Sequence, residues 1–377
     1  MNGRLVVALS QIFSHGGIPR FNQMLCLALD DLCPKLGLDV TVFSQLDGVE
    51  DYRRHSVRWK QLRFVPGGGG FGMVRRTLAL CVRERPDLLL VGLIGMTPLG
   101  LVCRPFVRNG FGFIAHGLEC WGSHTHPVVE TRRSRRYAAG KARFAFSVSA
   151  YTARELSAMV GIPPDRIYLL PNTLEPSFER LEENDAQGDV EQPPELLTIS
   201  RLWAEEKLKG VDHTLRAFAR LAGRHPGLRY SIVGKGSDKP RLLALAESLG
   251  VSDRVRFQQD LSDADLGDLY RRCTAMVLPS AQEGFGIVFL EAMRFSKPCI
   301  GGNVGGTPEV IDHGRTGFLV PFGDVDLLES SLERLLTDPD LRRTMGQAGR
   351  RRLLDCFTFD RYREKLEDNL RAVLQLG

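Results

Sequence analysis

Short apolar runs recur along the whole chain and alternate with longer segments of helical periodicity. Buried-strand patterns occur at residues 4–10, 39–44, 86–95, 110–117, 144–150, 195–201, 229–236, 254–258, 275–280 and 297–303. Amphipathic patterns such as residues 21–32 and 240–249 lie between them. Continuous apolar runs are typical of strands covered on both faces, and the helices between them make the crossovers of parallel sheets. The pattern predicts an α/β chain with doubly wound sheets.

The chain has 377 residues, more than one hydrophobic core usually organises, so two domains are expected, with a single barrel as the competing shape. An acidic segment that is poor in apolar residues and closed by two prolines, residues 176–194, is typical of a linker. We therefore expect a Rossmann-like domain over residues 1–178, a linker over 179–194 and a second Rossmann-like domain over 195–355. Residues 356–377 have the spacing of an amphipathic helix.

Composition narrows the class of protein. No window approaches the roughly 18 uninterrupted apolar residues of a membrane span, and the N-terminus is typical of a buried strand, so a soluble cytoplasmic protein is expected. The eight cysteines include no C-x-x-C pair and suggest small apolar side chains in a reducing compartment. Residues 1–178 carry 22 Lys and Arg against 13 Asp and Glu, whereas the remainder carries 28 against 32. The basic half is suited to an acidic partner or surface.

One glycine-rich stretch formally matches a dinucleotide-binding pattern. Gly67, Gly69 and Gly72 have the spacing G-x-G-x-x-G, but they lie far from the first predicted strand, which a dinucleotide site requires. A mobile surface loop that shapes the wall of a cleft is the favoured interpretation.

Two further glycines follow the first strand directly. Gly16 and Gly17 precede a helix that is expected to begin near Pro19, where glycines let backbone N–H groups approach a ligand's oxygens. A tight turn from strand to helix explains the same residues equally well.

A histidine ends a predicted strand in "FIAHGLECW". Ligands of open α/β sheets bind at the carboxyl ends of strands, so His116 could donate a hydrogen bond to a reacting sugar, or it could be structural. Glu119, Cys120, His124 and His126 lie nearby, but their spacing fits no standard zinc pattern, and no metal site is predicted.

In the second half, cations follow a strand in "TISRLWAEEKLKG". Arg201 comes just after the strand, and Lys207 and Lys209 precede Gly210 and a helix. Arg can grip two oxygens of a diphosphate and Lys supplies a point charge, although a solvated charged loop has the same composition.

The stretch "PSAQEGFGIVFLEAM" predicts a strand end, a loop and a helix. Gly284 and Gly286 leave backbone N–H groups unshielded where the helix begins at Ile287, which suits a phosphate. Glu283 in the loop and Glu291 on the helix's polar side can each accept hydrogen bonds from hydroxyls. Two acids beside a phosphate site indicate a nucleotide sugar, and two solvated acids are the alternative.

Together these motifs resemble a known family. Arg201 with residues 209–210, then residues 232–236, 277–293 and 305–320, are similar in order to the C-terminal domain of the retaining glycosyltransferases of family 4. Glu283 and Glu291 match that family's E-x7-E motif. The N-terminal segments "GGIPRFN", "AHG" and "SVSAYTARELSAMVGIPPDRIYLLPNT" are also similar, so the resemblance covers nearly the whole chain.

The resemblance implies the GT-B fold, in which two Rossmann-like domains face a cleft. The C-terminal domain would hold the donor, the N-terminal domain the acceptor, and residues 356–377 would cross back to the N-terminal domain. It also implies roles for single residues. The residues expected to take part in catalysis are His116, Arg201, Lys209 and Glu283, and those expected to bind the donor are Gly16, Gly17, Gly234, Gly236, Gly284, Phe285, Gly286, Ile287 and Glu291.

In detail, Arg201 and Lys209 would bind the diphosphate and Glu283 the donor sugar, while Glu291 would contact the ribose. His116 would contact the transferred sugar, and the two glycines at 234 and 236 would lie near the base. Two departures from the family pattern stand out. Lys207 rivals Lys209 for the diphosphate, and Asn172 is followed by "TLEPSF", where many members have a glycine and an aspartate.

The expected activity is metal-independent, retaining transfer of a hexose from a UDP- or GDP-linked donor, with no cofactor. A glycan or lipid-linked glycan of polysaccharide synthesis is the favoured acceptor, and a small natural product is the alternative. A sugar-nucleotide epimerase, a phosphorylase and an inactive sugar-binding protein are the rival functions.

A basic stretch points to a further partner. Residues 131–143 contain six cations, which suit either a solvated helix face or peripheral contact with anionic lipid on the cytoplasmic side of a membrane. The stretch is not an aromatic-interleaved basic motif of the nucleic-acid-binding kind, so no nucleic-acid partner is predicted.

Overall fold

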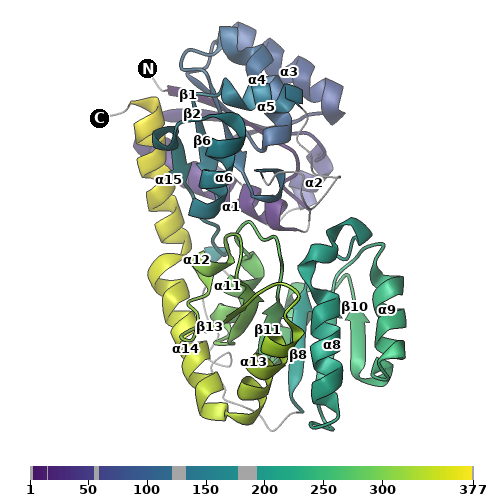
Figure 1. Ribbon diagram of the computed structural model, residues 1–377. Helices are drawn as coiled ribbons and strands as arrows, with labels where there is room; N and C mark the ends of the chain where they lie inside the picture. The colour runs from purple at the N-terminus through teal and green to yellow at the C-terminus, as the bar shows by residue number, and fades with distance from the viewer. Residues whose placement is uncertain (1–2, 15, 55–58, 121–132, 177–192, 376–377) are drawn as a thin grey trace. The chain divides into compact units, whose positions relative to one another are not determined.

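The computed structural model describes residues 3–14, 16–54, 59–120, 133–176 and 193–375. Contacts within the chain divide it into two compact units (Figure 1). Unit 1 comprises Met1–Glu175 with Phe359–Gly377, and unit 2 comprises Pro176–Thr358. The final helix therefore joins unit 1 from Phe359 rather than from residue 356, because the preceding helix continues to Cys356. Most of the predicted linker, 179–194, lies outside the described residues.

Unit 1 contains a seven-stranded sheet in the order β3-β2-β1-β4-β5-β6-β7, with every neighbouring pair parallel. Apart from Gly3 and Arg4 at the start of β1, its central strands are apolar and buried, as a sheet covered on both faces requires. The strands are β1 (Gly3–Leu9), β2 (Leu38–Ser44), β3 (Arg63–Pro66), β4 (Leu88–Val91), β5 (Phe111–Ala115), β6 (Phe144–Ser147) and β7 (Ile167–Leu169).

Among the described residues, six α-helices connect successive strands of unit 1, and the C-terminal helix joins the same unit. They are α1 (Gly17–Leu36), α2 (Val49–Arg54), α3 (Gly69–Glu84), α4 (Thr97–Cys103), α5 (Arg133–Gly140), α6 (Ala150–Val160) and α15 (Phe359–Leu374). Helix α15 lies beside α1, where Lys35 pairs with Glu367 at 2.6 Å and Asn369 donates to the carbonyl of Leu169 at 3.0 Å. These contacts explain why the C-terminal helix belongs to unit 1.

The predicted surface loop at the glycine-rich stretch is wrong. Gly67 and Gly68 form an ordered turn between β3 and α3, and α3 begins at Gly69. A Cβ on Gly67 would lie 2.6 Å from the carbonyl oxygen of Ser44, and a Cβ on Gly72 would lie 2.5 Å from that of Gly67. The glycines therefore serve close packing of a strand-to-helix turn.

Unit 2 contains a six-stranded parallel sheet in the order β10-β9-β8-β11-β12-β13. Its strands are β8 (Glu195–Ile199), β9 (Arg229–Val233), β10 (Val255–Gln258), β11 (Ala275–Leu278), β12 (Cys299–Gly302) and β13 (Gly317–Val320). Its helices are α8 (Val211–Ala222), α9 (Lys239–Ser248), α10 (Asp263–Arg272), α11 (Ile287–Arg294), α12 (Thr307–Val310), α13 (Val325–Thr337) and α14 (Pro339–Cys356). The predicted α/β class with two doubly wound parallel sheets is confirmed.

The strand order of unit 2 reverses between β8 and β11. The chain moves outward from β8 to β9 and β10, and then returns to the other side of β8 with β11. In open parallel sheets, ligands bind outside the carboxyl ends of the strands at such a switch point. This places the expected ligand site at the loops that follow β8 and β11.

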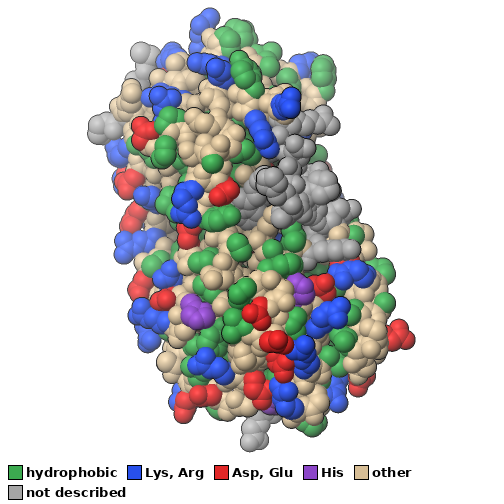
Figure 2. Space-filling view, viewed as in Figure 1, with side chains coloured by type: hydrophobic (Ala, Val, Ile, Leu, Met, Phe, Trp, Pro, Cys, Tyr) green, Lys and Arg blue, Asp and Glu red, His purple; other side chains and the backbone are tan. Residues whose placement is uncertain are grey.

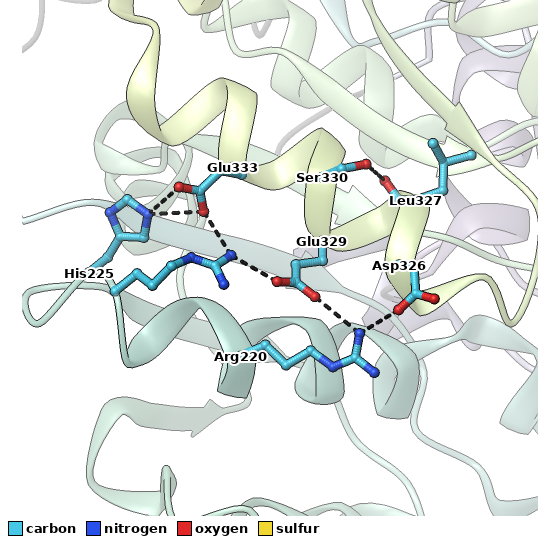
Figure 3. A network of polar contacts seen from close by, with 8 residues as sticks. Arg220, His225, Asp326, Leu327, Glu329, Ser330 and Glu333 are labelled. Carbon is cyan, nitrogen blue, oxygen red and sulfur yellow. Dashed lines mark hydrogen bonds and ion pairs between the residues drawn. The ribbon is translucent and has the colours of Figure 1, made fainter.

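A charged network fixes α8 against α13 (Figure 3). Arg220 contacts both Asp326 and Glu329. Arg224 forms ion pairs with Glu329 and Glu333. His225 approaches the same Glu333 at 3.2 Å. Since α8 directly follows Lys209 and Gly210, the network holds the helix that begins at the candidate site.

Charge differs between the two units. In Figure 2 the viewed face of unit 2 carries acidic and basic side chains side by side, whereas that of unit 1 shows more basic than acidic ones. Within the described residues, no helix is both long enough and apolar enough to cross a bilayer. The eight cysteines are free, and only Cys356 is exposed.

Candidate functional site

An ion pair lies at the switch point of unit 2. Lys209 Nζ donates to Glu283 Oε2 at 2.8 Å, and the two side chains are only 12% and 18% exposed. Lys209 ends the short 3-10 segment Ala204–Lys209, and Glu283 lies in the loop after β11. Partial burial strengthens the attraction between such charges relative to a fully solvated pair. The structure thus brings together two residues that are 74 positions apart in the chain.

The backbone beside Lys209 packs closely against the loop that carries Glu283. Ala281 donates its N–H to the carbonyl of Leu208 at 2.8 Å. Gly210 has φ 72°, and a Cβ there would lie 2.6 Å from the carbonyl oxygen of Pro279. Only glycine satisfies both the left-handed backbone and this approach, so Gly210 fixes the distance between the two loops.

A second glycine segment encloses the same loop from the side of β12. Gly306 donates its N–H to the carbonyl of Glu283 at 2.8 Å. A Cβ on Gly305 would lie 2.4 Å from that carbonyl oxygen, and one on Gly306 would lie 2.1 Å from the carbonyl oxygen of Gly284. The loop is therefore held between residues 208–210 and residues 305–306, which fixes the position from which Glu283 projects.

Helix α11 starts directly after this loop. Gly286 has φ 94°, and a Cβ there would lie 2.5 Å from the ring of Phe289. The first N–H groups of a helix have no partner within it, and they carry partial positive charge. Phe285 is 3% exposed and packs edge-on against Phe357 at 5.5 Å, so its side chain belongs to the core and only its backbone can face a ligand.

Glu291 differs from its prediction. The sequence places it on the polar side of α11, but its side chain is only 2% exposed. Its Oε2 accepts a hydrogen bond of 2.5 Å from the hydroxyl of Tyr270 on α10. The interpretation of residues 283 and 291 as two solvated acids is therefore wrong. Tyr270 was not identified from the sequence, where only its apolar helical spacing is visible.

Arg201 follows β8 and lies at the same edge of the sheet. Its loop is tied to the turn after β9, because Leu202 donates its N–H to the carbonyl of Lys235 at 2.8 Å. A Cβ on Gly234 would lie 1.8 Å from the carbonyl oxygen of Ser200, and one on Gly236 would lie 2.0 Å from the carbonyl carbon of Leu202. These two glycines therefore let the Arg201 loop lie directly against the turn.

One structural observation distinguishes Lys207 from Lys209 as candidates for binding the diphosphate. Lys209 is the lysine that pairs with Glu283, whereas the side chain of Lys207 lies outside the described part.

In unit 1, Gly16 and Gly17 lie at the start of helix α1. Gly16 has φ 134° and accepts the N–H of Arg20 at 3.0 Å. A Cβ on Gly17 would meet no atom of the described residues within 4 Å, so a ligand can approach its backbone closely. Asp47 holds the preceding loop by accepting the N–H of Ile12 and the hydroxyl of Ser44, both at 2.5 Å. Asp47 was not predicted from the sequence, although an acid just beyond the second strand is a usable signal.

His116 lies at the carboxyl end of β5. Its Nε2 contacts the carbonyl of Gly92 at 2.9 Å, and its ring meets that of Phe21 edge-on at 5.0 Å. A carbonyl can only accept, so Nε2 carries the hydrogen and Nδ1 is an acceptor. Burial lowers the pKa of His116 below 6.5, although the charge of Glu119 opposes the shift. In this tautomer the ring has no second N–H to donate, so Nδ1 could only accept a hydrogen bond. Contact of His116 with a sugar stays a prediction.

Of the residues near His116 that were considered for a metal, Glu119 and Cys120 are described. Glu119 Oε1 accepts the backbone N–H of His116 at 2.7 Å, and Cys120 is buried. His124 and His126 lie outside the described residues. Among those that are described, no three His, Cys, Asp or Glu side chains form a metal-binding group. Metal independence stays a prediction.

Comparisons with known proteins bear on the family of the chain. The sequence profile described as "Glycosyltransferase Family 4" matches residues 15–178, and "Glycosyl transferases group 1" matches residues 179–352. The D-inositol 3-phosphate glycosyltransferase of Streptomyces avermitilis is 36% identical over 179 residues, which cover 45% of this chain and 38% of that protein. The match thus spans well under two thirds of the relative's length.

Solved structures share the fold. Sucrose-phosphate synthase from Thermosynechococcus elongatus superposes with a TM-score of 0.81 at 19% identity, and all of both chains is covered. Anabaena HepE, in complex with UDP and glucose, gives a TM-score of 0.76 at 18% identity and covers 98% of this chain and 99% of its own. The chain belongs to the glycosyltransferases of family 4 and has the GT-B fold.

Proposed function

We propose that this glycosyltransferase transfers a hexose from a nucleoside diphosphate sugar with retention of the anomeric configuration. The observation that carries the proposal is the partly buried Lys209–Glu283 pair, held by glycine backbone at the switch point of unit 2. A cation and an acid side by side suit a donor whose diphosphate and sugar hydroxyls are neighbouring groups. Helix α11 adds backbone N–H groups at the same loop.

The proposed donor chemistry follows from charge. Breaking the bond between sugar and phosphate places negative charge on the departing diphosphate. Arg201, Lys209 and the N–H groups of Gly284–Ile287 would stabilise that charge more in the transition state than in the ground state. These cations would make a metal ion unnecessary. A UDP- or GDP-linked sugar is the proposed donor, and the UDP named with Anabaena HepE supports that class.

Retention would arise without a protein nucleophile. The acceptor hydroxyl attacks the oxocarbenium-like sugar on the face that the diphosphate leaves, and a departing phosphate oxygen takes the hydroxyl proton. The bond from the sugar to the phosphate breaks as the bond to the acceptor oxygen forms. Glu283 would accept hydrogen bonds from hydroxyls of the sugar. His116 would accept a hydrogen bond from a sugar hydroxyl through Nδ1.

The acceptor has two candidate classes. A small polar molecule is supported by the relative named for D-inositol 3-phosphate. A glycan or lipid-linked glycan is supported by the basic charge of unit 1. A screen of soluble polyols and phosphorylated polyols against lipid-linked saccharides, read by product mass, separates the classes.

Peripheral contact with anionic lipid belongs to the second class. Helix α5 exposes Arg133, Arg135 and Tyr137, and Lys141 follows it exposed. Each cation near an anionic surface contributes about 1 kcal/mol, so co-sedimentation with vesicles should rise with anionic lipid and fall with salt. Binding that depends on neither removes this contact, and with it the proposed place at the cytoplasmic face of a membrane.

The activity itself is tested by incubating the protein with UDP-, GDP-, ADP- and dTDP-sugars. Release of free nucleoside diphosphate is expected from at least one of them, and proton NMR of the product should give the donor's anomeric configuration. Interconversion of free nucleotide sugars would instead identify an epimerase. Binding without turnover would identify an inactive sugar-binding protein.

A further inference from the structure

Tyr270 contacts the second acid of the candidate donor site from a neighbouring helix. It lies on α10, fully buried, and its hydroxyl donates to Glu291 Oε2 at 2.5 Å. The carbonyl of Val288 is a second, longer contact at 3.5 Å. An O–H···O distance of 2.5 Å is in the range of a hydrogen bond to an ionised carboxylate. We propose that Tyr270 is a positioning residue that fixes the Glu291 carboxylate for the ribose of the donor.

The ring of Tyr270 is itself held in place. Phe295 stacks on it with the ring centroids 5.6 Å apart and the planes 9° from parallel. The guanidinium of Arg294 lies over Phe295 at 4.4 Å, and that of Arg271 lies over it at 5.4 Å. The ring of Tyr270 is therefore held by Phe295, which in turn packs under two guanidinium groups. Because the Tyr270 ring cannot move freely, its hydroxyl stays in one position when the Glu291 carboxylate rotates.

The consequence concerns the orientation of Glu291. A carboxylate offers about four acceptor positions and turns readily about its last torsion. The Tyr270 hydroxyl occupies one position and so sets the plane of the group. In the proposed role, the remaining acceptor positions would face a pair of adjacent ribose hydroxyls when the donor is bound. This inference rests on the proposed function, in which Glu291 contacts the ribose.

Tyr270→Phe is the direct test, since it removes the hydroxyl and keeps the ring. A matched control exists in the same unit. Tyr230 is also fully buried, and its hydroxyl contacts Thr198 Oγ1 at 2.7 Å rather than an acid of the site. Tyr230→Phe should thus reproduce the loss of a buried hydrogen bond without touching Glu291. Thermal unfolding of each variant checks that it is folded.

The readout is the affinity for UDP and GDP, each compared with its 2′-deoxy and 3′-deoxy form by calorimetry. In the wild type, removing a ribose hydroxyl should weaken binding about tenfold, the effect of losing one good hydrogen bond. In Tyr270→Phe the intact nucleotide should bind about five- to tenfold more weakly, and the penalty for the missing hydroxyl should shrink to about twofold. Tyr230→Phe should retain both the wild-type affinity and the full penalty.

The outcomes distinguish the positioning role of Tyr270 from the role of Glu291 in the donor site. If Tyr270→Phe behaves like Tyr230→Phe while Glu291→Gln loses the deoxy penalty, the positioning role is overturned and the donor site stands. If Glu291→Gln changes neither the affinity nor the penalty, or if the wild type binds neither nucleotide, the role proposed for Glu291 fails and this inference fails with it. Should Tyr270→Phe not fold, Phe295→Leu decides, because it keeps the hydroxyl and loosens its ring. An unchanged deoxy penalty in Phe295→Leu then overturns the proposal.

Discussion

Lys209 and Glu283 form a partly buried ion pair, with 2.8 Å between Nζ and Oε2. The pair joins the segment before α8 to the loop before α11, and both flanks are set by glycine backbone that admits no side chain. Each charge holds the other in position before any donor arrives. A diphosphate would thus meet a lysine that is already oriented, which lowers the reorganisation needed in the transition state.

Replacing Lys209 by alanine removes one fixed cation and leaves Glu283 without this partner. We expect kcat/KM to fall by two powers of ten or more, on the basis of about 3 kcal/mol for a charged contact to the leaving group. Arg201→Ala should have an effect of the same size. Steady-state kinetics with the donor found in the nucleotide-sugar screen measures both.

Lys207→Ala is the matched comparison for Lys209→Ala, since both remove a lysine from the same short segment. We expect it to stay within about threefold of the wild type. A large loss in Lys207→Ala together with a small loss in Lys209→Ala would exchange the roles of the two lysines.

Gly236→Ala tests how the Arg201 loop is seated. Its Cβ would lie 2.0 Å from the carbonyl carbon of Leu202, so the loop must move away from the turn after β9. Donor affinity should fall at least tenfold, because a small displacement of a positioning group has a large effect on a fixed ligand. Gly250→Ala is the control, since it shares a positive φ, and its Cβ would meet no described atom within 4 Å. Equal donor affinities in the two variants would contradict this explanation.

His116→Asn and His116→Ala test whether His116 acts as a hydrogen-bond acceptor or only fills space with its ring. Asparagine can donate to the carbonyl of Gly92 and still present an acceptor, whereas alanine can do neither. We expect kcat/KM to fall at least tenfold in His116→Ala and to be partly restored in His116→Asn. Similar losses of kcat/KM in both variants would exclude a role of His116 as a hydrogen-bond acceptor.

The same histidine predicts a pH dependence of stability. Burial lowers the pKa of His116 in the folded state below 6.5, so the unfolded chain takes up a proton first as the pH falls. Stability from this group is complete above pH 6.5 and declines below it. The melting temperature of the wild type should therefore drop more steeply between pH 7 and pH 5.5 than that of His116→Asn. Parallel curves would contradict the buried neutral ring.

The charged network between α8 and α13 predicts a separate acid transition. A hydrogen bond from Arg224 lowers the pKa of Glu329 below 4.5, with a further contribution from Arg220. Burial raises the pKa of Glu333, but hydrogen bonds from His225 and Arg224 outweigh it and the pKa is lowered. A carboxyl group whose pKa is lowered in the folded state stabilises the fold above pH 4.5, and this stabilisation is lost as the pH falls further. Glu329→Gln should flatten the decline in melting temperature below pH 4.5 and leave the curve between pH 5 and pH 7 parallel to that of the wild type.

The strands that the sequence analysis missed share a position in the sheets. Strands β3 and β7 are the two edges of the sheet in unit 1, and β13 is an edge of the sheet in unit 2. β3 and β7 are only four and three residues long and mostly half-buried, so each gives too short a pattern to be recognised. β13 is buried throughout, and its omission has no such explanation. The central strands, buried on both faces, were all predicted.

The candidate site was predictable where chemistry follows a strand end. Arg201, Lys209 and Glu283 stood out because each follows a strand end, and their expected roles came from the resemblance to family 4, since a solvated loop has the same composition. Tyr270 and the burial of Glu291 were not, because both depend on how α10 packs against α11, which is a tertiary contact. The packing reason for Gly236 was likewise invisible, since it lies in the closeness of two loops from different strands.

The most direct measurement of the central claim is calorimetric titration of the wild type, Arg201→Ala and Lys209→Ala with UDP, GDP, ADP and dTDP. We expect the wild type to bind at least one of these nucleotides and each variant to bind it at least tenfold more weakly. Binding to the wild type that neither substitution changes, or binding to none of the four, would contradict a donor site built on these two cations.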